Sequence, residues 1–71
     1  MSINYVEVAA DLLFMADEME ATRPEICQNL RRDYNLSLNK VHDLFWAWMD
    51  AGQPHNINSI INNAWKDLMD D

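Results

Sequence analysis

Acidic side chains recur near the start of the sequence at spacings that place them on one face of a helix. Glu7, Asp11 and Glu18 follow an i, i+4, i+11 pattern, and Phe14 occupies the i+7 position between them. Paired carboxylates act as a general acid and base only where a cleft desolvates one of them, and no feature of the sequence indicates such a cleft. A phenylalanine surrounded by carboxylates is instead typical of a surface that recognises a protein partner.

A second aromatic side chain, Trp46, is predicted to lie on a polar helix face. If residues 37–51 form a helix, one face carries the apolar side chains Leu38, Val41, Leu44, Phe45, Trp48 and Met49. The opposite face carries Trp46 among polar and acidic groups. We therefore expect a protein interface that consists of Glu7, Asp11, Phe14, Glu18, Asn39, Asp43, Trp46 and Asp50.

The residues that most often carry catalysis or bind metals are few and poorly spaced. His42 and Asp43 are adjacent, so they do not face each other on a helix, and His55 falls in a predicted loop. Neither histidine has the i, i+4 partner that a helical metal site needs, and Cys27, the only cysteine, excludes an intrachain disulfide. Gly52 is the only glycine, so a Gly-rich phosphate loop is absent. We expect a protein that is not an enzyme and uses no cofactor or metal.

Composition predicts one small folded domain with an acidic surface. A chain of 71 residues has room for a single domain, residues 1–71, and a hydrophobic content of 49% is enough for a packed core. The net charge of −7 repels phosphate backbones and attracts basic protein surfaces, so it disfavours nucleic acid as a direct ligand. The longest uncharged apolar run, residues 12–16, is far too short for a signal or membrane-spanning segment. We expect a cytoplasmic protein without membrane contact.

The first half of the chain carries two helix-start signals. Asn4, followed by Glu7, predicts a helix that runs to about Ala21, with an inward stripe of Tyr5, Val8, Leu12, Ala16 and Met19. Thr22 predicts the cap of a second helix, because Pro24 fits its first turn and Glu25 occupies the N3 position. This helix should bury Ile26, Leu30 and Tyr34 and end near Asn35.

The second half of the chain predicts two further helices. Ser37 should cap the third helix, which ends at Gly52 with Pro54 just beyond it. Asn56 or Asn58 can open a fourth helix, whose inward residues should be Ile61, Ala64, Trp65 and Leu68. No alternating apolar pattern indicates a strand. The predicted fold is therefore an all-α, compact four-helix domain.

The segment of residues 22–52 resembles the helix-turn-helix core of winged-helix regulators. The structural positions of that trihelical core would be Ile26, Leu30, Leu36, Leu38, Val41 and Leu44. The sequence departs from the family after Gly52, where Pro54 and an Asn-rich helix replace a β-hairpin wing. The resemblance implies a dimeric DNA-binding regulator whose reading face is Asn39, Lys40, Asp43, Trp46 and Asp50. Two carboxylates on such a face would oppose the phosphate attraction that supplies most DNA affinity.

Two functional interpretations follow. The first is a small acidic, non-catalytic interaction protein of the adaptor, inhibitor or anti-repressor (DNA-mimic) type, from a phage or other mobile element, that binds a protein with a basic surface. Because short helices leave Phe14, Trp46 and the Ile3–Ala10 edge exposed, we also expect a symmetric homodimer. The alternative is a helix-turn-helix DNA-binding regulator that contacts nucleic acid through Arg31, Arg32 and Lys40. The simpler interpretation is that the two arginines complement the dipole at a solvated helix end.

Overall fold

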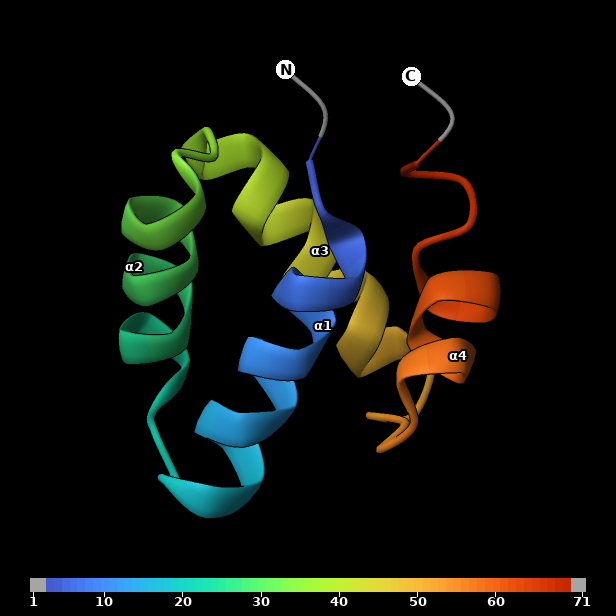
Figure 1. The fold of residues 1–71 in the computed structure, drawn as a ribbon, viewed down its shortest axis with the longest axis horizontal. Coiled ribbons are helices and arrows are strands. Elements are labelled where there is room, and N and C mark those ends of the chain that lie inside the picture. The colour runs from blue at the N-terminus through green and yellow to red at the C-terminus, as the bar shows by residue number, and fades with distance from the viewer. Residues whose placement is uncertain (1–2, 70–71) are drawn as a thin grey trace.

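Four helical segments make up the described part of the chain, residues 3–69, in a computed structural model (Figure 1). Helix α1 (Tyr5–Leu13) continues into a wider turn, η1 (Phe14–Glu18), and α4 (Ile57–Ser59) continues in the same way into η2 (Ile60–Ala64). Between them lie α2 (Arg23–Tyr34) and α3 (Leu38–Asp50). Figure 1 shows α2 on one side and α4 on the other, with α1 and α3 between them. The predicted all-α fold with four helices is confirmed.

Each α-helix begins at a side chain that accepts a hydrogen bond from a backbone N–H of its own first turn. The four caps are Asn4, Thr22, Ser37 and Asn56. At α2 the arrangement is reciprocal, because Thr22 Oγ1 accepts from the Glu25 N–H and Glu25 Oε1 accepts from the Thr22 N–H, both at 3.4 Å. A cap of this kind contributes about 1 kcal/mol to helix stability. All four predicted starts are thus confirmed, with Asn56 rather than Asn58 at the fourth.

The predicted ends of α2 and α3 are confirmed as well. Asn35 adopts a left-handed conformation at φ 53°, where its N–H bonds to the carbonyl of Arg31. Gly52 follows α3 at φ 87°, a conformation that is costly for residues with a Cβ atom. The chain therefore turns sharply after each of these two helices.

The predicted end of the first helix at Ala21 is wrong. Helix α1 ends at Leu13, and a wider turn closes when the Met19 N–H bonds to the Phe14 carbonyl at 3.2 Å. Glu20 then takes a positive φ of 50° and reverses the chain toward α2. The change of period moves Met19, a predicted core residue, into solvent, where 54% of it is exposed.

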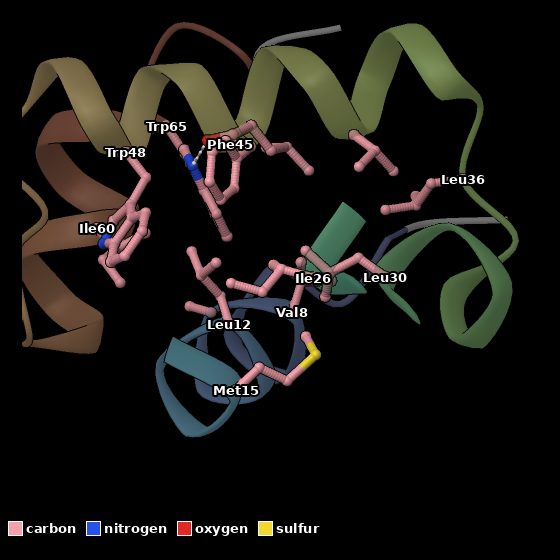
Figure 2. Close-up of a cluster of buried hydrophobic side chains, with 13 residues drawn as sticks. Val8, Leu12, Met15, Ile26, Leu30, Leu36, Phe45, Trp48, Ile60 and Trp65 are labelled. Atoms are coloured by element: carbon pink, nitrogen blue, oxygen red, sulfur yellow. Dashed lines mark hydrogen bonds between the residues drawn. The ribbon is translucent and has the colours of Figure 1, made fainter. Parts of the chain in front are cut away.

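The core lies between α1 and α3, and α2 and α4 close its two ends (Figure 2). The cluster consists of Val8, Ala9, Leu12, Met15, Ile26, Leu30, Leu36, Val41, Leu44, Phe45, Trp48, Ile60 and Trp65. Both buried indoles satisfy their N–H groups: Trp65 Nε1 donates to the Leu44 carbonyl at 2.8 Å, and Trp48 Nε1 donates to the Pro54 carbonyl at 3.0 Å. These two bonds fix the third helix against the C-terminal segment and the loop that precedes it.

Several predicted inward residues are half-buried or exposed rather than buried: Tyr5, Ala16, Met19, Tyr34, Leu38, Met49, Ile61, Ala64 and Leu68. Leu38 and Ile61 show two of the reasons. Leu38 is 47% exposed because it occupies the first position of α3, where the helix has just begun. In the fourth segment Ile60, not Ile61, is fully buried. The Trp65 N–H bonds to the Ile60 carbonyl at 2.8 Å, an i→i+5 pattern that aligns residues five apart. The α-helical period of 3.6 residues places Ile61 on the same face as Trp65, so the prediction of Ile61 as the buried isoleucine is wrong.

Candidate functional site

A second apolar stripe runs along α1 into the start of η1, and only its half-buried member Leu13 packs against the core. Val6, Ala10, Leu13 and Phe14 follow i, i+4, i+7, i+8 spacing and form what we call the α1 outer face. Val6 and Phe14 are each 55% exposed, Ala10 is exposed and Leu13 is half-buried. Phe14 and the Ile3–Ala10 edge were predicted to be exposed from the sequence. Leu13 was not, although its position seven residues after Val6 places it on the same helix face.

Only part of the predicted acidic rim of the α1 outer face is open to solvent. Glu7 and Glu18 are exposed. Asp11 is half-buried, and its carboxylate accepts a hydrogen bond from the hydroxyl of Tyr34, which also lies 3.1 Å from the Glu7 carbonyl oxygen. Burial, and after it this hydrogen bond, raise the pKa of Tyr34 above its usual value. Asp11 therefore joins α1 to α2 as well as contributing negative charge.

A further carboxylate near the α1 outer face, Asp17, pairs with the loop before α4. Its Oδ2 lies 2.7 Å from His55 Nδ1, and both side chains are largely exposed. Sequence reasoning placed His55 in a loop but could not pair it with a residue 38 positions away. An exposed pair of this kind adds little stability.

Trp46 is 49% exposed, and two residues fix its position. Its ring meets Phe45 edge-on, with centroids 6.1 Å apart at 86°. The guanidinium carbon of Arg23, at the start of α2, lies 5.4 Å from the centroid of the Trp46 ring, a cation–π arrangement. Its predicted neighbours Asn39, Asp43 and Asp50 are exposed along α3.

The predicted interface residues fall into two groups. Figure 2 shows α1 and α3 on opposite sides of the buried cluster. Phe14 and Trp46 each belong to the exposed side of their own segment. The set on α1 and η1 (Glu7, Asp11, Phe14, Glu18) and the set on α3 (Asn39, Asp43, Trp46, Asp50) are therefore separate patches rather than one surface.

The three basic residues predicted as alternative nucleic-acid contacts have different local surroundings. Lys40 Nζ donates to the Leu68 carbonyl at 2.7 Å and lies 5.6 Å from the Tyr5 ring centroid, so it holds the C-terminal segment. Arg32 pairs with Asp33 at 3.2 Å. Arg31 and Arg32 line a shallow depression at the end of α2 together with Gln28, Asn35 and Leu36. DNA reading by these residues stays a prediction.

Within residues 3–69, no three side chains among the histidine, cysteine, aspartate and glutamate residues come close enough together to hold a metal ion. In the same part of the chain no helix combines the length and the apolar character that a membrane crossing requires. Comparison with family models, with curated proteins and with solved structures finds no significant match to this chain.

Proposed function

We propose that this chain is a small acidic, non-catalytic interaction protein that binds a basic protein partner through the α1 outer face. The observation that carries the proposal is that α1 and the start of η1 have apolar side chains on two faces, one buried and one exposed. The helix already buries Val8, Ala9 and Leu12, yet leaves Val6 and Phe14 each 55% exposed. Exposed apolar stripes bordered by charge are typical of protein interaction sites.

Charge determines the kind of partner. Glu7 and Glu18 are exposed beside the stripe, and the whole chain has a net charge of −7. An acidic rim steers a basic surface toward the apolar anchor and raises the association rate, while the anchor limits dissociation. An adaptor, an inhibitor or an anti-repressor that occupies a basic nucleic-acid cleft would each use such a surface. We propose the cytoplasm of a cell that hosts a phage or another mobile element as its setting.

Without its partner, the α1 outer face is a candidate for self-association. Two copies could bury Val6 and Phe14 against each other in a symmetric dimer. Each copy carries a net charge of −7, so repulsion opposes this dimer at low ionic strength. Salt should therefore strengthen the homodimer and weaken the complex with a basic partner. The sign of the salt dependence distinguishes these two forms of association.

The experiment compares three immobilised proteins: the wild type, Phe14→Ser and the matched control Trp46→Ser. Basic proteins that the immobilised wild type retains from cytosol are purified and titrated against all three in a salt series. We expect Phe14→Ser to weaken binding at least tenfold, about 1.4 kcal/mol, with the control unchanged. Equal binding by all three proteins would contradict the proposal.

The helix-turn-helix alternative predicts a different outcome when the same proteins are titrated with duplex DNA. The order of α2, a three-residue connection and α3 is the order that this motif requires. A DNA-binding regulator would bind duplex DNA tightly without any dependence on Phe14. It would lose binding when Arg31 and Arg32 are replaced by alanine.

A further inference from the structure

A shallow hollow lies between the first turn of α2 and the middle of α3, apart from the α1 outer face. We call it the α2–α3 hollow, and its lining is Arg23, Pro24, Cys27, His42, Phe45 and Trp46. Among residues 3–69 no acidic side chain lines this hollow, whereas an arginine and a histidine do. The depression at the end of α2 is also cationic, but of the two only the α2–α3 hollow combines an arginine with aromatic side chains.

The side chains of the hollow are held in place before anything binds. Phe45 is 3% exposed, belongs to the core and packs edge-on against Trp46. The proline ring of Pro24 is rigid, and the guanidinium carbon of Arg23 lies 5.4 Å from the centroid of the Trp46 ring. Side chains that are already ordered lose little conformational entropy on binding, so a preformed apolar hollow can bind a small group efficiently.

Arg23 is available for a carboxylate from outside. Among residues 3–69 it has the Trp46 ring as a neighbour but no carboxylate within ion-pair distance. Among the same residues none of the guanidinium N–H groups of Arg23 donates a hydrogen bond, so they remain for a bidentate bond to a carboxylate. The hollow thus offers an apolar floor and a cationic rim side by side.

We propose that the α2–α3 hollow is a second docking site, which takes a segment of an acidic partner protein. The segment would place a leucine- or phenylalanine-sized side chain against Trp46 and Phe45 and an adjacent carboxylate on Arg23. The chain would then bridge two proteins of opposite charge, one on each side of its core. Asp43 and Asp50, three and four residues from Trp46 on α3, are the nearest negative charges along that helix, but neither lines the hollow. More distant charges are largely screened at physiological salt, where the screening length is about 8 Å.

Nuclear magnetic resonance of the full chain tests the proposal through the indole N–H groups. Those of Trp48 and Trp65 are bonded to backbone carbonyls inside the protein, so they serve as internal references for the exposed Trp46. Trp46→Phe assigns its signal. The probes are three capped peptides of equal length: acetyl-SGLEFEGS-amide, its glutamine version acetyl-SGLQFQGS-amide and its lysine version acetyl-SGLKFKGS-amide.

We expect the glutamate peptide to shift the Trp46 signal saturably and to bind about tenfold more tightly than the glutamine peptide, a ratio typical of one charged hydrogen-bonded pair. Arg23→Gln should remove this difference, and the matched control Arg31→Gln, on the same helix but outside the hollow, should preserve it. Equal affinity for the glutamate and glutamine peptides, or tighter binding of the lysine peptide at Trp46, would overturn the proposal. A shift caused by sodium acetate alone at the same concentration would also overturn it, because a free carboxylate would then suffice.

This outcome is independent of the proposed function. The lysine peptide is expected at the α1 outer face, where the backbone signals of Val6 and Ala10 report it. If the lysine peptide does not shift the Val6 and Ala10 signals while the glutamate peptide still shifts the Trp46 signal, only the α1 interface is contradicted. If the lysine peptide shifts Val6 and Ala10 but the glutamate peptide does not shift Trp46, only the hollow is contradicted.

Discussion

The hydroxyl of Tyr34 donates its proton to the carboxylate of Asp11 and so joins the last residue of α2 to the middle of α1. The two residues are 23 positions apart in the chain. The bond occupies one of the carboxylates beside the α1 outer face, and it makes the packing of α1 on α2 sensitive to alkaline pH.

Alkaline pH should destabilise the protein through Tyr34. Burial, together with the bond to Asp11, raises the pKa of Tyr34 in the folded state above its ordinary value near 10. Its contribution to stability is therefore complete below about pH 10 and is lost as pH rises toward the folded-state pKa, because the unfolded tyrosine ionises first. Urea unfolding at pH 8 to 11 should show the free energy of unfolding falling above pH 10.

Tyr34→Phe should remove this part of the pH dependence and lower the stability at pH 7 by about 1 kcal/mol, the net contribution of one hydrogen bond. Asp11→Asn should make the dependence shallower, because it removes the charge that disfavours the phenolate. An identical alkaline slope in the wild type and Tyr34→Phe would show that the bond has no such effect.

The three tryptophans should differ sharply in their contribution to stability. Trp65 is fully buried and Trp48 is 2% exposed, so replacing either by alanine creates a cavity and should cost about 3–5 kcal/mol. Trp46→Ala should cost less than about 1 kcal/mol, because the side chain is half exposed and loses mainly its contact with Arg23. Thermal unfolding measures all three, and an unfolded Trp46→Ala protein would show that this residue belongs to the core.

Self-association should depend on Phe14 and increase with salt. Sedimentation of the wild type at low and high ionic strength should show a shift from monomer toward dimer as repulsion between the two −7 charges is screened. Phe14→Ser should stay monomeric under both conditions, and Trp46→Ser should behave as the wild type. A mass of 8.3 kDa at every concentration and salt would exclude the dimer.

Duplex DNA should bind weakly, with a Kd no tighter than about 10⁻⁴–10⁻⁶ M at physiological salt. Asp43 and Asp50 are exposed on α3 and oppose phosphate, so Asp43→Asn with Asp50→Asn would strengthen binding if α3 faced DNA. Fluorescence anisotropy with labelled duplexes provides the measurement. Nanomolar, sequence-dependent binding that disappears with Arg31→Ala and Arg32→Ala would make the helix-turn-helix interpretation correct.

Local sequence was sufficient to predict where the helices begin and where two of them end. Capping by Thr22 or Ser37 needs only the next three residues, and the left-handed turns at Asn35 and Gly52 depend on the residue itself. The exposure of Phe14 and Trp46 also followed from helical periodicity, because α-helical geometry determines which side chains share a face.

Tertiary packing decided the features that this periodicity missed. The wider turns η1 and η2 change the number of residues per turn, so Met19 faces solvent and Ile60 replaces Ile61 in the core. The contacts that define the candidate surfaces join residues far apart in the chain: Tyr34 with Asp11, and Arg23 with Trp46. Cap and turn signals act over three or four residues, whereas these pairs form only when whole helices pack together. For this reason the sequence alone determined the helices and their exposed aromatics, and only the folded chain decided that these aromatics lie on two separate surfaces.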